Sequence, residues 1–160
     1  MDIGAGYGRL AHRGTTAFPS TTYLCTDALP EATFLSEYYL DYRGVADRAH
    51  VLPLDEVALA IEDQPIDVAV NVHSFSECPL SAIEWWLDLL VANDVENLMI
   101  VPNTEAVSRE GGAAPRDFMP AIQARQFEPV CTRPKYAHSD LVQRHGIFPT
   151  TYFLFRRQHS

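Results

Sequence analysis

The sequence predicts an α/β fold with a doubly wound, mostly parallel sheet, and two observations carry this prediction. Segments rich in β-branched and aromatic residues alternate with helix-like segments along the chain, an order typical of parallel sheets. Residues 68–72 and 98–101 are near-continuous apolar runs, as expected of strands that helices cover on both faces. A chain of 160 residues suits one domain, here 1–160.

The expected elements follow one another in a regular order. Strands are expected at residues 22–26, 49–52, 67–72, 97–101, 127–131 and 151–156. Helices are expected to start at residue 8 and to cover 31–42, 55–62, 79–91 and 117–126. Because no helix-length apolar period separates the last two strands, we expect them to form an antiparallel pair. Residues 110–115 are expected to form a loop, either a plain one or a lid beside a cleft.

The composition excludes several classes of protein. The net charge of −9 disfavours a phosphate backbone as partner, so no nucleic acid is expected. Residues 111–160 nevertheless carry more basic than acidic side chains. This basic excess is either a solvated face or an anion-binding surface. The chain has no apolar run long enough to span a membrane and no signal pattern. Its three scattered cysteines suggest neither disulfides nor zinc, so a cytoplasmic protein without a membrane partner is expected.

The first eight residues carry the strongest chemical pattern, Asp2-Ile-Gly4-Ala-Gly6-Tyr7-Gly8. Glycines allow a strand to turn sharply into a helix and allow a ligand to approach bare backbone, as nucleotide-like cofactors do. The dinucleotide fingerprint G-x-G-x-x-G would require glycine at position 9, where this chain has arginine. The pattern G-x-G-x-G therefore disfavours a nicotinamide-dependent oxidoreductase.

An acidic residue at the end of the next strand supports a nucleotide-like cofactor. Asp27 follows the glycines by about 20 residues, where a carboxylate can accept both hydroxyls of a ribose. The alternative is that Asp27 is a helix-cap or turn residue before Pro30.

With these motifs the chain resembles the class I S-adenosylmethionine-dependent methyltransferases, which have a Rossmann-like fold. The resemblance implies that Asp2, Gly4, Gly6, Tyr7 and Gly8 cradle the methionine and ribose parts of S-adenosylmethionine and that Asp27 binds the ribose. It also suggests Asp55 as a contact to adenine, although the sequence after it favours a helix cap. The glycine turn together with Asn71-Val-His73-Ser-Phe-Ser-Glu77 looks most like the sugar O-methyltransferases of this family.

The polar segment 71–77 follows an apolar strand, so it is expected at the carboxyl ends of the strands, where α/β sheets bind their ligands. His73 is the first candidate for the base that takes the proton of an attacking hydroxyl, and Glu77 is the second. Alternatively, His73 orients a loop, and Ser76 or Glu77 caps the helix that begins near Pro79. Asn71 either contacts the methionine amino group or holds the turn.

The expected function is methyl transfer from S-adenosylmethionine to a hydroxyl of a sugar or another small polar acceptor. The alternative is a non-catalytic, methyltransferase-like binding or scaffold subunit. No metal is expected, although Glu77 and residues 103–105 could supply oxygen ligands. Trp85 and Trp86 are adjacent in one helix, so at least one is exposed or faces a ligand or a partner, which leaves room for a homo-oligomer.

The first strand is expected to be truncated, because only Met1 precedes Asp2 where the family has several apolar residues. A shortened strand leaves ladder groups of its neighbours unpaired. We therefore expect lower stability and weaker cofactor retention than in a chain extended at its amino end, as parallel melting of the two would show.

Overall fold

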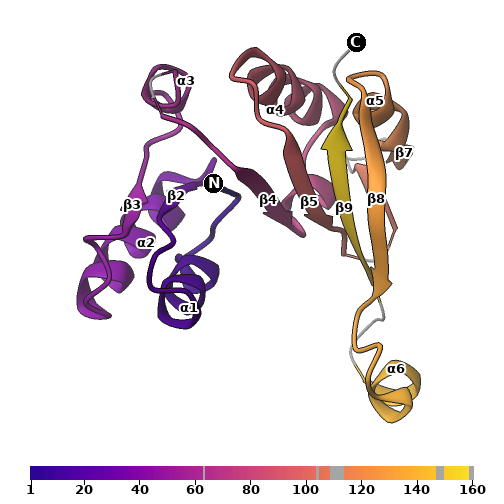
Figure 1. The fold of residues 1–160 in the computed structure, drawn as a ribbon, viewed down its shortest axis with the longest axis horizontal. Helices are drawn as coiled ribbons and strands as arrows, with labels where there is room; N and C mark the ends of the chain where they lie inside the picture. Colours follow the sequence, from indigo (N-terminus) through magenta and orange to yellow (C-terminus); the bar gives the residue numbers. More distant parts are fainter. Residues whose placement is uncertain (63, 104, 109–113, 147–149, 159–160) are drawn as a thin grey trace. The chain divides into compact units, whose positions relative to one another are not determined.

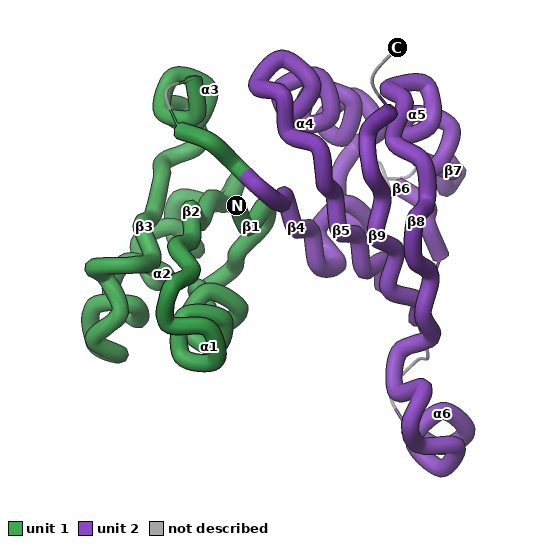
Figure 2. Tube along the Cα trace, in the orientation of Figure 1, with its two compact units in different colours: residues 1–66 green, residues 67–160 purple. Residues whose placement is uncertain are grey.

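The structure is a computed structural model of the chain. It describes residues 1–62, 64–103, 105–108, 114–146 and 150–158. Two compact units, residues 1–66 and 67–160, make up the chain (Figure 2). Most of the loop expected at 110–115 lies outside the described residues.

The first unit alternates strands and helices (Figure 1). Its elements are β1 (Asp2–Ile3), α1 (Arg9–Ala17), β2 (Tyr23–Thr26), α2 (Pro30–Tyr42), β3 (Ala49–Val51) and α3 (Val57–Ala60). β1 pairs with β2 and β2 with β3, both in parallel. β1 is only two residues long, in line with the short first strand that the sequence predicts.

Small residues bring α1 close to the strands of this unit. Ala11 of α1 is fully buried in a cluster with Cys25, Leu40 and Ala49, which joins both helices to β2 and β3. A Cβ atom added at Gly14 would overlap the phenol group of Tyr23. The helix that starts from the glycine turn is thus fixed against the sheet by its small side chains.

The second unit contains a four-stranded sheet and a small hairpin. Its elements are β4 (Val68–Val72), the 3₁₀ turn η1 (Ser74–Ser76), α4 (Leu80–Ala92), β5 (Asn97–Val101), β6 (Val107–Ser108), β7 (Arg116–Asp117), α5 (Met119–Gln123), β8 (Phe127–Pro134), α6 (Asp140–His145) and β9 (Thr151–Arg157). β4 and β5 are parallel, whereas β9 is antiparallel to both β5 and β8. The predicted fold class, with its antiparallel C-terminal strand pair, is confirmed.

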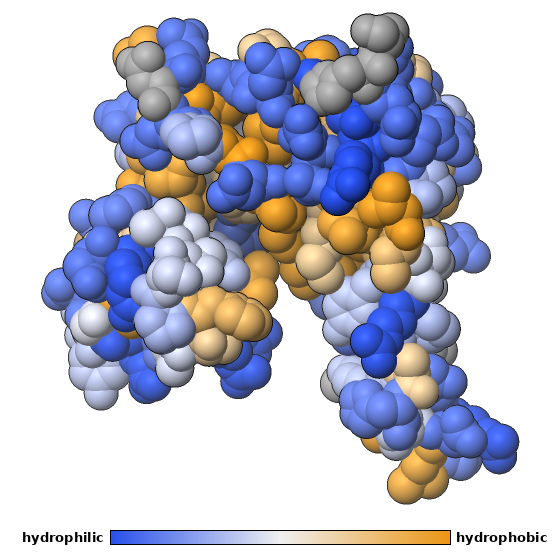
Figure 3. Space-filling model, in the orientation of Figure 1, coloured by the Kyte–Doolittle hydropathy of each residue, from blue (hydrophilic) through white to orange (hydrophobic). Residues whose placement is uncertain are grey.

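The two faces of this sheet differ in how they are covered. Leu87 of α4, Ile122 of α5, and Leu98 and Phe155 of the strands are fully buried, and α4 contacts α5. On the opposite face Met99 is only half-buried, and Cys131 and Arg133 are exposed. Figure 3 shows hydrophobic residues (orange) on the part of this unit turned towards the viewer.

One edge of this sheet gathers several chain segments. β4 and β5 end together, since Val72 pairs with Val101. β9 begins and β8 ends at the same edge, because both strands run antiparallel to their neighbours. α6 lies beyond the end of β8 (Figure 1), and none of its residues is buried.

The structure differs from the predicted elements mainly in short segments. α5 covers Met119–Gln123 rather than 117–126. It starts later because Asp117 belongs to β7, and Gln126, with a φ of 64°, cannot continue the helix. α6, η1 and the β6–β7 hairpin were not predicted, since segments of two to six residues carry too little apolar periodicity. Of the adjacent tryptophans, Trp86 is buried and Trp85 is 44% exposed, as the sequence predicts for such a pair. No helix among the described residues has both the length and the apolar character to cross a membrane.

The core of the second unit predicts an asymmetric response to two leucine substitutions. Leu87→Ala removes a fully buried side chain and should lower the free energy of unfolding by about 2–5 kcal/mol. Leu141→Ala, at a position that is 72% exposed, should change it by less than about 0.5 kcal/mol. Urea denaturation followed by circular dichroism measures both, and equal effects would contradict the described core.

Candidate functional site

The glycine turn between β1 and α1 has the backbone conformation that its sequence predicts. Gly4, Gly6 and Gly8 adopt φ values of 73°, 56° and 82°, which side chains other than glycine rarely allow. The N–H groups of Gly4 and Ala5 donate to the carbonyl of Thr26 at 2.9 and 3.0 Å. The turn is therefore fastened to the end of β2.

Two of these glycines serve different purposes. A Cβ atom at Gly8 would lie 2.7 Å from Ser36 Oγ and 3.0 Å from Leu40 Cγ, so Gly8 permits the close packing of α2. A Cβ atom at Gly6 would meet no described atom within 4 Å. The backbone at Gly6 is thus open on the side where a side chain would stand.

Asp27 is tied directly to the glycine turn. Its Oδ2 accepts the N–H of Gly6 at 2.9 Å, and its Oδ1 accepts the N–H of Leu29 at 3.0 Å. The second bond is that of a turn residue before Pro30, the alternative that the sequence left open. Because each carboxylate oxygen has a further lone pair, the turn role leaves acceptor capacity for a ligand.

Asp2 is the most perturbed acid of this unit. The residue is 2% exposed, and its Oδ2 is buried without a hydrogen-bond partner. Burial raises the pKa of Asp2 from 3.8 to about 6, and the nearby Asp27 carboxylate adds to the rise. A buried acceptor without a partner, close enough to Asp27 for that charge to raise its pKa, is a feature expected of a ligand site.

Tyr7 belongs to this turn, whereas Asp55 lies on the segment between β3 and α3. Tyr7 is 44% exposed, and its ring stands edge-on to Tyr39 with 5.1 Å between the centroids. Asp55 is exposed, and its side chain makes no hydrogen bond or ion pair with a described residue. The predicted helix cap at Asp55 is wrong, because α3 begins at Val57 with Glu56 as its N-cap residue and without a side-chain cap bond.

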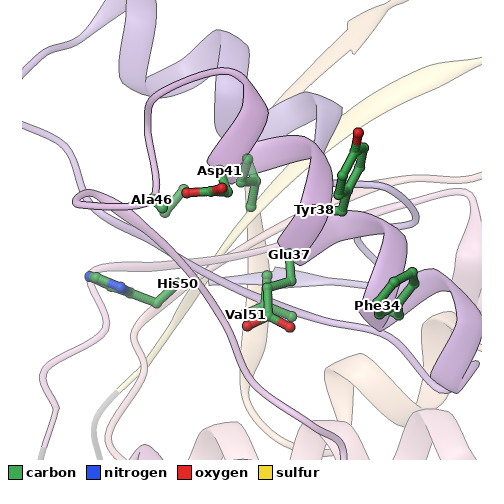
Figure 4. A pocket seen from close by; sticks show the side chains of 9 residues that line it. Phe34, Glu37, Tyr38, Asp41, Ala46, His50 and Val51 are labelled. Atoms are coloured by element: carbon green, nitrogen blue, oxygen red, sulfur yellow. The ribbon is translucent and has the colours of Figure 1, made fainter.

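A separate cavity of about 470 Å³ lies on the first unit between α2 and β3 (Figure 4). Glu37 and Asp41 of α2 and His50 of β3 are among its lining residues. None of the predicted site residues lines it. This cavity is therefore distinct from the glycine turn.

In the second unit, Asn71 organises the turn that follows β4. The residue is fully buried, its Nδ2 donates to Ser74 Oγ, and its Oδ1 accepts the N–H of Phe75 at 3.0 Å. Asn71 thus holds the turn, one of its two expected roles.

His73 occupies a strained position in this turn. Its φ is 73°, a rare value for a residue with a side chain and one that is enriched at functional sites. Its N–H donates to the carbonyl of Val101 at 2.7 Å, and its Nε2 is buried without a partner. Burial lowers the pKa of His73, the charge of Lys135 lowers it further, and Glu77 opposes both. The lowered pKa favours the neutral imidazole, and its buried Nε2 has no hydrogen-bond partner among the described residues.

Ser76 and Glu77 contact the loop after β5 rather than capping α4. Ser76 Oγ accepts the N–H of Asn103, and Glu77 Oε1 accepts its side-chain amide, both at 3.2 Å. The N-cap residue of α4 is Pro79, without a side-chain cap bond, so the helix-cap alternative for Ser76 and Glu77 is wrong. Among the described residues, no group of three or more His, Cys, Asp or Glu side chains is arranged to hold a metal ion.

Comparison with known proteins identifies the fold. No protein-family model matches the chain, and no curated protein matches its sequence. One similar solved structure is the M1A22 tRNA methyltransferase TrmK of B. subtilis, with a TM-score of 0.70 and 11% sequence identity. The match covers 98% of this chain and 58% of the TrmK chain. Mitomycin 7-O-methyltransferase MmcR has a TM-score of 0.70 and 20% identity over 98% of this chain and 48% of its own.

A third solved structure contains a ligand. TrmK of M. capricolum, in complex with its cofactor product S-adenosyl-homocysteine, has a TM-score of 0.62 and 11% identity over 98% of this chain and 61% of its own. The chain spans about three fifths of the length of the first solved structures that it matches. These similarities confirm a Rossmann-like fold. They include methyltransferases that act on different acceptors, so the finer resemblance to sugar O-methyltransferases stays a prediction.

The predicted site residues thus form one group in each unit. Asp2, the three glycines, Tyr7 and Asp27 lie around the turn after β1, and Asn71, His73 and Glu77 lie around the turn after β4. The sequence did not indicate the contact between Ser76 and Asn103, because the two lie 27 residues apart and meet only through the pairing of β4 with β5.

The buried Asp2 predicts an unusual pH dependence of stability. Because the pKa of Asp2 is higher in the folded chain, the folded state binds more protons between pH 4 and 6 than the unfolded state, and stability falls as the pH rises. The shift corresponds to about 3 kcal/mol. Urea denaturation at several pH values should show this fall in the wild type and a flatter profile in Asp2→Asn. Parallel pH profiles of stability in the wild type and in Asp2→Asn would contradict the raised pKa of Asp2.

Proposed function

We propose that the chain is an S-adenosylmethionine-dependent methyltransferase that acts on a hydroxyl of a sugar or another small polar acceptor. The observation that carries the proposal is the glycine turn fastened to Asp27, with the open backbone at Gly6 and the unpaired Oδ2 of Asp2 beside it. The Rossmann-like fold and the S-adenosyl-homocysteine bound to M. capricolum TrmK support it.

The residues of the first unit fit this cofactor. The open side of Gly6 leaves room for a ligand against bare backbone. The Asp27 carboxylate keeps lone pairs that can accept the ribose hydroxyls. In this proposal the glycines and Asp2 hold the methionine and ribose parts, Tyr7 lies beside them, and Asp55 contributes a weaker contact near adenine.

The second unit supplies the groups for the acceptor. S-adenosylmethionine carries a methyl group on a sulfonium, so attack by a hydroxyl oxygen forms an O–C bond while the C–S electron pair leaves with sulfur. His73 takes the hydroxyl proton, since its lowered pKa keeps it neutral. Glu77 is the second candidate for this role, and Asn71 fixes the turn that carries both.

Charge favours a small acceptor over a nucleic acid. The chain has a net charge of −9, which disfavours a long polyanion, although the tRNA methyltransferase TrmK has the same fold. Binding of S-adenosylmethionine without methylation of any hydroxylated compound would favour the alternative of a scaffold subunit.

Cofactor binding tests the first part of the proposal. Calorimetry should detect S-adenosyl-homocysteine but not NAD, and Asp27→Ala should weaken S-adenosyl-homocysteine about tenfold to a hundredfold through the loss of charge-assisted hydrogen bonds. Asp47→Ala, another acidic residue of the first unit that is exposed, serves as the matched control and should bind normally.

A nucleoside analogue separates the ribose role of Asp27 from its role in the turn. The wild type should bind S-adenosyl-homocysteine more tightly than its 2′,3′-dideoxyribose analogue, whereas Asp27→Ala should bind both equally. An unchanged preference in Asp27→Ala would refute the ribose contact while leaving the turn contact intact.

Turnover tests the second unit. His73→Ala should lower the rate of methyl transfer about a hundredfold to ten-thousandfold, as expected for a lost general base, and Glu77→Ala should lower it less. Both variants should keep the affinity for S-adenosyl-homocysteine. Mass spectrometry of methylated products from a panel of hydroxylated metabolites measures the rates, and unaltered rates in both variants would leave catalysis to positioning alone.

A further inference from the structure

The second unit contains a cavity of about 550 Å³ on the half-covered face of its sheet, a size typical of small-molecule sites. Strand pairing explains its floor. Met99 pairs with Leu154, which pairs with Cys131, and Tyr152 pairs with Arg133, so these side chains share one face. All five line the cavity.

A turn between β8 and α6 forms the rim of this cavity. Tyr136 and His138 line it, and Tyr136 adopts a φ of 60°, a strained value for an aromatic residue. The turn is nevertheless well fastened, because the N–H of Ser139 donates to the carbonyl of Tyr136 at 2.9 Å. Ser139 also caps α6 through its side chain, which gives this exposed helix a role in holding the rim.

The cavity reaches the same sheet edge as His73, although neither His73 nor Glu77 lines it. Hydrogen bonds connect the two along that edge: the N–H of Lys135 donates to the carbonyl of Thr150, and Thr150 Oγ1 donates to the carbonyl of Pro102, both at 2.7 Å. Pro102 follows Val101, whose carbonyl accepts the N–H of His73. The charge of Lys135 is also close enough to perturb the pKa of His73.

Basic side chains gather at this cavity without acidic partners. Arg133 and His138 line it, and Lys135 stands between two lining residues with its Nζ 5.6 Å from the ring centroid of Tyr136. None of the three has an ion pair with a carboxylate of a described residue. Three described arginines, Arg48, Arg125 and Arg157, form ion pairs with carboxylates at 3.5, 2.6 and 2.8 Å. The other described Lys and Arg side chains, like those at the cavity, form none with a described carboxylate.

We propose that this cavity holds the methyl acceptor and that the acceptor is a small hydroxylated anion, bearing a carboxylate or a phosphate. The inference rests on the proposed methyl transfer and names the substrate class of that site. A guanidinium such as that of Arg133 binds either anion through paired N–H donors, and the tyrosine rings and Met99 provide an apolar surface for the rest of the molecule. A basic cluster at a cavity thus becomes part of acceptor selection rather than a solvated face.

The charge of the cavity can be measured with Cys131 as a reporter. Cys131 is exposed and lines the cavity, whereas Cys25 is buried, so Cys78→Ser confines labelling to Cys131. Two reagents are compared, a negatively charged sulfonatoethyl thiosulfonate and its trimethylammonium counterpart. The ratio of their reaction rates with Cys131 should favour the negative reagent about tenfold more in the folded protein than in the urea-unfolded chain. Arg133→Gln should abolish this preference, and Arg13→Gln, on the first unit, should retain it. A preference equal to that of the unfolded chain would overturn the proposal.

Calorimetry on the S-adenosyl-homocysteine-loaded protein tests the acceptor itself. Glucuronate and glucose 6-phosphate are compared with glucose, and 4-hydroxybenzoate with its amide. At least one anion should bind about tenfold or more tightly than its neutral partner, and Arg133→Gln should remove the difference while the affinity for S-adenosyl-homocysteine stays unchanged. The carboxylate and phosphate arms show which anion is preferred.

The outcomes separate this inference from the proposed function. Failure of S-adenosyl-homocysteine to bind would refute the methyltransferase proposal. Normal binding of S-adenosyl-homocysteine with no anion preferred over its neutral partner, or with tighter binding of an RNA stem-loop than of any small anion, would overturn the acceptor inference alone.

Discussion

The hydrogen bond from the Gly6 N–H to the Asp27 carboxylate is the contact on which the cofactor proposal depends. It joins the turn after β1 to the residue that follows β2, over 21 positions of sequence, at 2.9 Å. A turn built of residues with positive φ lacks the regular backbone hydrogen bonds of a helix or a strand. This bond and the two bonds to the Thr26 carbonyl therefore fix the orientation of its backbone. The same carboxylate is therefore both part of the scaffold and a candidate ligand for ribose.

Much of the fold followed from burial patterns in the sequence. β4 and β5 were predicted almost to the residue because each is a near-continuous apolar run, although the structure leaves alternate residues of both strands half-buried. The long helix α4 was predicted because its apolar residues recur with helical spacing. α6 gave no such pattern, since it buries no residue and depends on the cap at Ser139. The cap expected at Asp55 failed because α3 begins only at Val57. The alternative of a cap at Ser76 or Glu77 failed because both side chains accept hydrogen bonds from Asn103 instead.

The candidate site was predictable in its residue types but not in its contacts. The spacing of the glycines and of Asp27 requires only neighbouring strands, so sequence alone suffices to group them. The positive φ of His73 and its bond to Val101 depend on how β4 and β5 end, a detail that no local pattern encodes. Lys135 lies 62 positions from His73 in sequence, and the antiparallel return of β9 and β8 brings its charge to the same edge.

The opposite signs of the overall charge and of the cavity are compatible because they act over different distances. At physiological salt, charges separated by more than about 8 Å are largely screened. A small anion inside the cavity therefore responds mainly to Arg133, Lys135 and His138, whereas a long polyanion must also lie along the acidic remainder of a chain with net charge −9. In the proposed function, the residues that attract a carboxylate or a phosphate monoester are too few to retain a nucleic acid. Local unpaired cations on an acidic protein select for the size of an anion as well as for its charge.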